Sequence, residues 1–268
     1  MSRNINSPQE STYVCDVVSL GQVGYRFDFK NIVIYIDPYL TNSVQENEGD
    51  DLVRMLPIPV APNEITDADY VLITHEHRDH CDPDTLIPLT KSSHRARLIC
   101  PNQVKKMLID WGINEERIIT AGDDKITIVQ DELDIYVVPA AHPEIECDSD
   151  GFLRYVGYVI NYKGRRIYHA GDTALTSAII EKLNSIGSID VAFIPVNEQN
   201  YYRAHRGIIG NMSIRDAFFM AGAIGAKVMV PTHWDMFAVN QVYKEEIELL
   251  YNNINPPFHL AINPAVLR

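Results

Sequence analysis

The chain contains the stretch Tyr70-Val71-Leu72-Ile73-Thr74-His75-Glu76-His77-Arg78-Asp79-His80, in which an apolar run passes directly into ionisable side chains. The run at 70–74 predicts a buried strand. Alternate residues after a strand project the same way, so His75 and His77 can bind one metal ion, with Asp79 and His80 turned toward a second position. Imidazole nitrogen and carboxylate oxygen are ligands for Zn²⁺, Mn²⁺ and Fe²⁺. The alternative is a surface cluster of histidines and acids, but a chance match to all four positions is on the order of one in a thousand.

Three further ionisable side chains each follow a predicted strand. His142 comes after the run at 133–138, Asp172 after the run ending at His169, and His233 after the run at 228–231. A single histidine at a strand end is more often a hydrogen-bonded structural residue than a ligand. Together with the first motif, however, these residues form a set of histidines and aspartates in one consistent structural position. We therefore predict that all these residues belong to one metal-binding site.

The rest of the chain alternates between short β runs and amphipathic helices. The runs at 12–20, 23–29 and 32–36 predict a meander, and Lys163-Gly164 predicts a hairpin turn. This pattern favours an α/β fold of two sheets packed face to face with helices outside, as a single domain at 11–268 after a polar tail at 1–10. The polar segment at 41–64 fits either a lid or a subunit contact. Helices are expected at 83–91, 102–111, 175–186, 213–225 and 239–251, with Ser213 as an N-cap.

Composition excludes several classes of protein. The 268 residues include 23 Lys and Arg against 36 Asp and Glu, a net charge of −13 that would repel nucleic acid. No apolar run approaches the ~20 residues of a membrane span, and no signal-peptide pattern is seen. The four cysteines form no CxxC pair, which argues against a zinc–thiolate site or a disulfide framework. We expect a cytoplasmic protein with a small-molecule substrate and no nucleic-acid or membrane partner. The sequence does not decide between a monomer and a homo-oligomer.

These motifs resemble the metallo-β-lactamase superfamily, whose members carry HxHxDH and then a His, a bridging Asp and a last His at successive strand ends. The resemblance spans the chain from Leu20 to His233 and implies a four-layer αββα sandwich of two mixed sheets. Within that superfamily, the sequence resembles the L-ascorbate-6-phosphate lactonase family. The supporting stretches are Leu20-Gly21-Gln22-Val23-Gly24, Tyr168-His169-Ala170-Gly171-Asp172, Arg206-Gly207, Asn211-Met212-Ser213 and Pro231-Thr232-His233-Trp234-Asp235.

The resemblance also implies a dinuclear centre of two divalent ions, Mn²⁺ or Zn²⁺. Two such ions ~3.5–4 Å apart can share a hydroxide as the nucleophile and stabilise the resulting oxyanion. Asp79 can pass a proton to a leaving alkoxide, so Asp79 and Asp172 are the expected catalytic residues. The implied ligands are His75, His77 and His142 for one ion and Asp79, His80 and His233 for the other, with Asp172 as the bridge.

The segment at 197–211 is basic and aromatic in an otherwise acidic protein. This composition suits a phosphorylated, sugar-like substrate, with Arg206 as a bidentate phosphate clamp. An ordinary solvated loop is the alternative reading. Asp235 and His169 are expected to orient a liganding histidine from behind. The expected substrate-binding residues are Tyr202, Arg203, His205, Arg206 and Asn211.

Four functions remain to be weighed. The first is hydrolysis of the lactone of a phosphorylated sugar acid, which would place the protein in carbohydrate metabolism. The second is cleavage of a small phosphodiester, because the same nucleophile can attack phosphorus. Oxygen or nitric-oxide reduction at a di-iron site usually needs an attached flavin domain, for which 268 residues leave no room. A non-catalytic metal-binding protein is disfavoured because the ligand set is complete.

Overall fold

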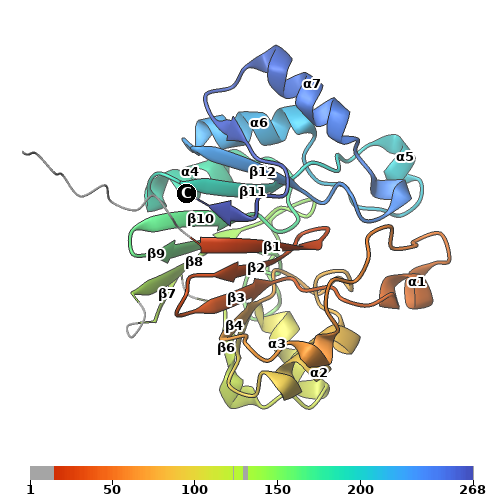
Figure 1. Cartoon of the computed structure of the whole chain (residues 1–268), viewed down its shortest axis with the longest axis vertical. Helices are drawn as coiled ribbons and strands as arrows, with labels where there is room; N and C mark the ends of the chain where they lie inside the picture. Colours follow the sequence, from red (N-terminus) through yellow and green to blue (C-terminus); the bar gives the residue numbers. More distant parts are fainter. Residues whose placement is uncertain (1–14, 123, 129–131, 268) are drawn as a thin grey trace, which may run out of the picture.

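Two sheets of seven strands form the centre of the computed structural model, which describes residues 15–122, 124–128 and 132–267 (Figure 1). The predicted tail at 1–10 lies outside these residues. The first sheet contains β1 (Cys15–Gly21), β2 (Gly24–Asp28), β3 (Val33–Ile36), β4 (Tyr70–Leu72), β5 (Arg97–Cys100), β6 (Ile118–Thr120) and β14 (Val266–Leu267). The second contains β7 (Lys125–Ile128), β8 (Leu133–Pro139), β9 (Val156–Tyr162), β10 (Arg165–His169), β11 (Val191–Pro195), β12 (Val228–Thr232) and β13 (His259–Leu260).

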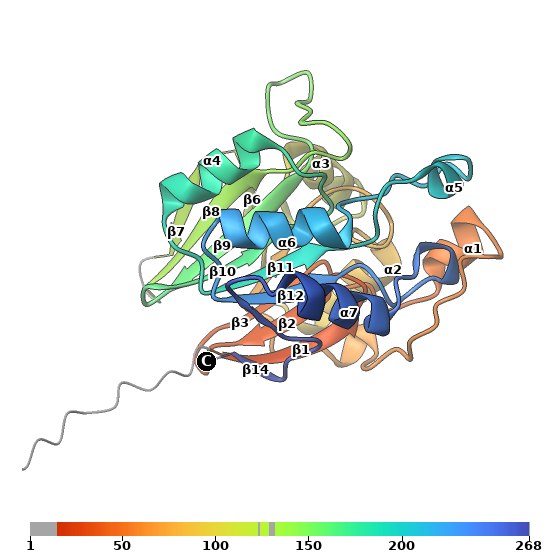
Figure 2. The ribbon, with the colours of Figure 1, turned by 90° about the horizontal axis from the view of Figure 1, so that it is seen from above.

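Helices cover the outer faces of both sheets (Figures 1 and 2). Two lie on the first sheet, α2 (Pro83–Ser92) and α3 (Asn102–Asp110). Three lie on the second, α4 (Ser177–Ile186), α6 (Ile214–Ala223) and α7 (Lys244–Ile254). The predicted four-layer αββα sandwich is thereby confirmed. No helix in the described part of the chain has both the length and the apolar character that crossing a bilayer requires.

The main core lies between the two sheets. It is built from inward-facing side chains of both, because alternate residues of a strand point to the same face. Phe27 of β2 and Phe193 of β11 meet edge to face with ring centroids 5.2 Å apart. Tyr25 packs on the same Phe193 ring at 4.7 Å. These contacts hold the sheets in a fixed relation, so residues at the end of one sheet can face residues of the other.

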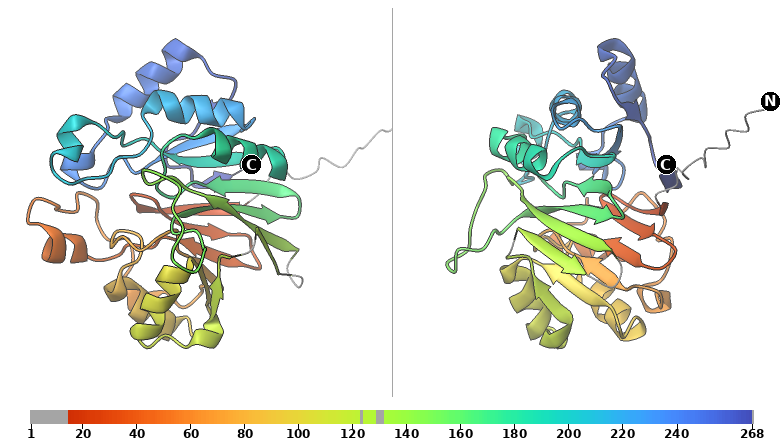
Figure 3. Two further views of the ribbon diagram at one scale, coloured as in Figure 1. Left: turned by 180° about the vertical axis from the view of Figure 1, so that it is seen from behind. Right: turned by 90° about the vertical axis from the view of Figure 1, so that its left-hand side faces the viewer.

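Strand directions bring many carboxyl ends to one edge. In the first sheet β1, β3 and β4 run the same way, because β2 is antiparallel to its two neighbours and β3 is parallel to β4. In the second sheet β10, β11 and β12 are parallel, and β8 shares their direction because β9 is antiparallel to both β8 and β10. The short helices α1 (Ser43–Glu48) and α5 (Tyr201–Ala204) lie together at one end of the molecule (Figures 1 and 3).

Within the described residues, the predicted helices and strands are found with small shifts, and one predicted helix begins later than expected. Residues 12–14 of the first predicted strand lie outside the described residues. Ser213 caps α6, accepting a hydrogen bond from the Asp216 backbone, as predicted. The last helix was expected at 239–251, but Ala238–Asn240 forms a 3₁₀ turn and α7 begins only at Lys244. The Val242 N–H donates to the Trp234 carbonyl, which holds this part of the chain in a loop. The alternation of strands and helices along the sequence led to the prediction of a helix over these residues, and this tertiary contact holds them in a loop instead.

Candidate metal-binding site

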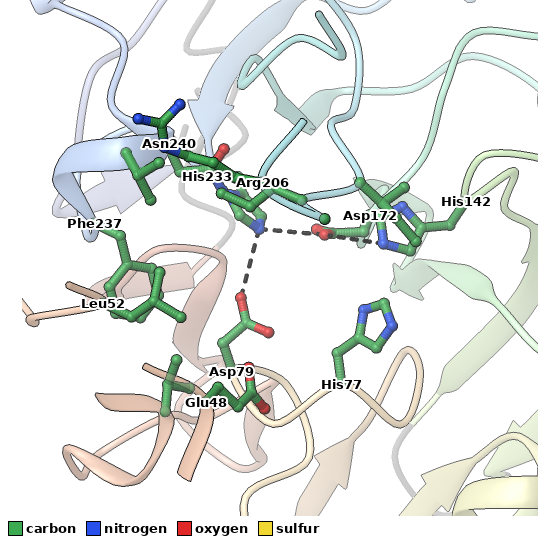
Figure 4. A pocket seen from close by; sticks show the side chains of 15 residues that line it. Glu48, Leu52, His77, Asp79, His142, Asp172, Arg206, His233, Phe237 and Asn240 are labelled. Atoms are coloured by element: carbon green, nitrogen blue, oxygen red, sulfur yellow. Dashed lines mark hydrogen bonds and ion pairs between the residues drawn. The ribbon is translucent and has the colours of Figure 1, made fainter. Parts of the chain in front are cut away.

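All seven predicted ligands meet at the shared edge of the two sheets. Asp172 lies at the centre, with Oδ2 3.2 Å from His233 Nε2 and 3.8 Å from His142 Nε2 (Figure 4). Its Oδ1 lies 3.4 Å from His80 Nε2. Three groups of side chains have ligand atoms that all lie within 4.8 Å of one another. They are His75 with His77 and His142, His75 with His80 and Asp172, and Asp79 with His80 and His233.

The chemistry of these side chains fits a divalent cation. Buried His80 Nε2 and Asp172 Oδ1 have no hydrogen-bond partner in the described part of the chain, which is rare for buried polar atoms. Burial lowers the pKa of His142 to about 4, which leaves a neutral imidazole with a free lone pair at pH 7. Burial also favours the neutral form of Asp172, but His233 and His80 outweigh it and hold the pKa of this carboxyl well below its usual range. Burial likewise lowers the pKa of His75, so His75 and His142 offer neutral nitrogens beside a charged carboxylate. Burial also acts to lower the pKa of His80, but Asp172, Asp79 and Asp37 outweigh it and raise that pKa well above its usual range.

Asp37 supports this cluster and was not predicted from the sequence. It is fully buried and accepts hydrogen bonds from the Thr74 N–H at 2.8 Å and the Thr74 hydroxyl at 2.6 Å. Its other contact is with His80 Nδ1 at 2.8 Å, so it fixes the orientation of that ring. Asp37 is the first ionisable residue after β3. The rule that selected His142 could have selected it as well.

Strained backbone marks the same edge. Gln22, Asp37 and His233 have φ values of 59°, 42° and 59°, in the left-handed region that L-residues rarely adopt. Each such residue costs on the order of 1–3 kcal/mol, and these residues cluster at functional sites. Gly171 has φ 62°, and a Cβ there would lie 2.9 Å from the Thr74 side chain. Glycine lets the turn after β10 approach the end of β4.

Asn211, predicted to contact substrate, instead lies in a buried row of asparagines. Its Nδ2 donates to Asn197 Oδ1 at 3.0 Å, and Asn197 Nδ2 donates to Asn240 Oδ1 at 3.1 Å. Asn240 Nδ2 lies 3.3 Å from His233 Nδ1. Asn211 therefore supports His233 through two other amides and does not line the cavity described below.

His169 and Asp235 do not contact a predicted ligand histidine, contrary to expectation. His169 Nδ1 accepts from the Gly171 N–H at 3.2 Å, so Nε2 carries the proton and donates to the Val23 carbonyl at 2.7 Å. Asp235 accepts from the Gln22 N–H at 3.3 Å. Both side chains hold the backbone of turns beside the site. Their influence on the histidines is indirect.

A cavity of about 320 Å³ opens over the predicted ligands (Figure 4). The segment at 41–64, which the sequence left open as a lid or a subunit contact, forms one wall. The loop after α5 and the turn after β12 form the others. The floor contains His77, Asp79, His142, Asp172 and His233, and the walls contain Val44, Glu48, Leu52, Arg206, Gly207, Ile208, Ile209, Phe237, Val239 and Asn240.

Of the predicted substrate-binding residues, the structure places Arg206 on the cavity wall. Its guanidinium carbon lies 3.9 Å from the centre of the exposed Tyr202 ring, so Tyr202 holds the arginine. His205 stacks on Tyr201 outside the cavity lining. Arg203 is buried and donates to the Glu198 carbonyl at 2.6 Å and the Gln241 carbonyl at 3.2 Å. The short helix α5 turns Arg203 inward, so its guanidinium binds backbone carbonyls and does not line the cavity.

A family model described as a beta-lactamase superfamily domain matches residues 33–234, a range that contains all seven predicted ligands. The fold is the metallo-β-lactamase fold. The chain belongs to the beta-lactamase superfamily.

A curated relative named "Probable L-ascorbate-6-phosphate lactonase UlaG", from Salmonella heidelberg (strain SL476), is 28% identical over 211 residues. A protein of the same name from Salmonella paratyphi B matches at the same identity. The match covers 74% of this chain, and the chain spans 58% of the length of these relatives.

Two solved structures show the same fold. Igni18, a metallo hydrolase from Ignicoccus hospitalis, has a TM-score of 0.69 at 19% identity, covering 94% of this chain and 96% of that one. An isothiocyanate hydrolase from Delia radicum gut bacteria has a TM-score of 0.72 at 16% identity, covering 94% and 97%.

Proposed function

We propose that this protein is a metal-dependent hydrolase that opens the lactone ring of a phosphorylated sugar acid similar to L-ascorbate-6-phosphate. The observation that carries the proposal is a buried set of metal-type donors at the floor of a cavity with Arg206 on its wall. Among the described lining residues, Arg206 is the only Lys or Arg. A cavity of about 320 Å³ suits a small molecule. The relative named a probable lactonase adds support.

In the proposed reaction, different residues of the cavity bind metal, transfer a proton and bind phosphate. Two ions, Mn²⁺ or Zn²⁺, would be held by the seven predicted ligands, and when bound they polarise a carbonyl and lower the pKa of water. Water adds its oxygen to the lactone carbonyl carbon, the ring C–O bond breaks, and the departing alkoxide takes a proton. The carboxylate of Asp79, which lines the cavity, would take the proton that the water loses and pass it to this alkoxide. Arg206 binds the phosphate with two parallel N–H donors.

Hydrolysis of a small panel of substrates tests the proposal. The panel contains L-ascorbate-6-phosphate, the same lactone without phosphate, and bis(p-nitrophenyl) phosphate, each with protein loaded with Mn²⁺ or Zn²⁺. We expect hydrolysis of the phosphorylated lactone, and loss of that activity with chelator or in Asp172→Ala. Preference for the phosphodiester, or lactone hydrolysis undiminished in Asp172→Ala, would contradict the proposal.

Arg206→Ala tests the phosphate contact. A charge-assisted contact contributes about 1.5–3 kcal/mol, so KM for the phosphorylated lactone should rise about 10–100-fold while kinetics on the unphosphorylated lactone stay unchanged. Arg215→Ala removes an exposed arginine of α6 that does not line this cavity and is the matched control. An equal effect of Arg206→Ala on both lactones would show that Arg206 does not bind phosphate.

A further inference from the structure

Gln22 stands at the tip of the hairpin between β1 and β2, and its position is unusual for glutamine. Its side chain is buried, with 3% of the residue exposed. Its backbone has φ 59°, which a glycine would adopt without the steric cost of a Cβ. A polar side chain that is both buried and carried on strained backbone needs a reason to be there.

The amide of Gln22 lies between two predicted ligands that come from different sheets. Gln22 Nε2 donates to Asp79 Oδ2 at 2.6 Å and lies 3.1 Å from His233 Nε2. Asp79 follows β4 of the first sheet, whereas His233 follows β12 of the second. One side chain therefore spans the junction between the two sheets at the floor of the cavity.

The backbone around Gln22 leaves this amide little freedom. The His233 N–H donates to the Gln22 carbonyl at 3.0 Å, and the Gln22 N–H donates to Asp235 Oδ1 at 3.3 Å. The carbonyl of Leu20, two residues before Gln22, accepts from the Arg54 guanidinium at 2.7 Å. The hairpin tip is thus fixed to the turn that carries His233. Both the backbone carbonyl and the backbone N–H of Gln22 are therefore hydrogen-bonded to that turn.

We propose that Gln22 is a positioning residue for one of the two cations, the one assigned to Asp79, His80 and His233. Its N–H donates to Asp79 Oδ2, the oxygen that lies 3.6 Å from both His80 Nε2 and His233 Nε2, and so orients this carboxylate toward the cation. It also fixes the separation between Asp79 and His233, which two independent sheets would otherwise set loosely. Within the described part of the chain, the Gln22 amide does not contact the set formed by His75, His77 and His142, so the cation of that set should not depend on this amide. The inference deepens the proposed function and shares its requirement for metal.

Titration with Zn²⁺ alone, in competition with a chromophoric chelator, tests this role. Wild-type protein should bind two equivalents. Gln22→Leu keeps the approximate size of the side chain and removes the amide, so one of the two binding steps should lose at least tenfold in affinity while the other stays within twofold. Gln22→Gly also removes the amide and suits the left-handed backbone, so it decides the question if the leucine variant fails to fold. Gln103→Leu makes the same exchange on α3 and should leave both steps unchanged.

Selective loss of one binding step in both Gln22 variants supports the inference. Two unchanged steps, two steps weakened equally, or a wild-type protein that binds fewer than two equivalents would each overturn it. The proposed function fails separately: if wild-type protein binds two Zn²⁺ and hydrolyses no lactone, the substrate assignment falls and the role of Gln22 stands.

Discussion

Single side chains behind the predicted ligands determine how firmly the ligands are held. Asp37 is the best placed of them, because its carboxylate contacts both Thr74 and His80 while fully buried. A carboxylate on the far nitrogen of an imidazole fixes the tautomer and raises the basicity of the nitrogen that faces a metal. The ring of His80 thereby keeps Nε2 directed toward Asp172.

Asp37→Asn should weaken metal activation without unfolding the protein. The amide keeps the shape of the side chain but removes the charge beside His80, and such changes typically reduce metal affinity 10–100-fold. The measurement is the Mn²⁺ concentration that gives half-maximal hydrolysis, with thermal unfolding as a check on the fold. An unchanged half-saturating concentration would show that Asp37 does not act on the metal site.

The sequence predicted which histidines and aspartates come together better than it predicted the residues around them. His142, Asp172 and His233 are each the first ionisable residue after a strand, and that local rule suffices to find them. Arg203 and Asn211 lie in a segment whose composition suggested substrate contacts, but their orientation depends on α5 and on partners distant in the sequence. Gln22 was visible only as part of a family motif. Its contacts with Asp79 and His233 cross 57 and 211 positions of the chain.

Among the elements, the segment at 41–64 is held in place by the hydrogen bonds of one arginine. Arg54 donates to the carbonyls of Tyr39 at 2.7 Å, Leu20 at 2.7 Å and Leu56 at 2.9 Å. Its guanidinium also lies 5.3 Å from the centre of the Tyr39 ring. This fork of donors ties a wall of the cavity to the hairpin that carries Gln22.

Arg54→Ala should therefore loosen that wall. Three carbonyl acceptors lose a charged donor, and we expect a loss of about 2–3 kcal/mol in unfolding free energy. Hydrogen exchange should speed up in residues 41–56 and in the hairpin tip. Arg54→Lys should not restore protection, because one ammonium cannot reproduce the fork. Unchanged exchange in this segment would refute the role of Arg54.

Asp190 ties β10 to the strands beside it. Its Oδ2 accepts from the Arg166 N–H at 2.9 Å, and its Oδ1 pairs with Lys227 at 2.7 Å. Burial acts to raise the pKa of Asp190, but the Lys227 and Arg166 contacts outweigh it and hold this pKa below its ordinary value of 3.8. A lowered folded-state pKa means that the stabilisation is present above the unfolded pKa and is lost as the pH falls through the folded one.

Asp190→Asn should accordingly be less stable than wild type at pH 7, by about 1–2 kcal/mol. The difference should shrink as the pH is lowered below 4, because the wild-type carboxyl then becomes protonated and loses its advantage. Denaturant unfolding of both proteins at a series of pH values provides the comparison. A difference that stays constant down to pH 3 would contradict this account.

At the scale of the whole molecule, the predicted ligands of the two sheets meet at one edge because the strands that precede them share one direction within each sheet. Hydrophobic patterning predicted those strands, since each buries side chains in the core between the sheets. Patterning could not predict α1 or α5, which have six and four residues and too few turns for a periodic signal. The two-residue strand β14 pairs with β1 from the opposite end of the chain, a contact that no local pattern encodes.

The central claim is that seven side chains from both sheets hold two cations. The most direct test is a crystal structure of protein loaded with Mn²⁺ or Zn²⁺, with anomalous diffraction recorded at the absorption edge of the metal. We expect two anomalous peaks, each about 2.0–2.3 Å from its nitrogen and oxygen ligands. One should lie among His75, His77 and His142, the other among Asp79, His80 and His233, with Asp172 contacting both. No peak at this edge of the sheets, or a metal bound elsewhere, would contradict the account.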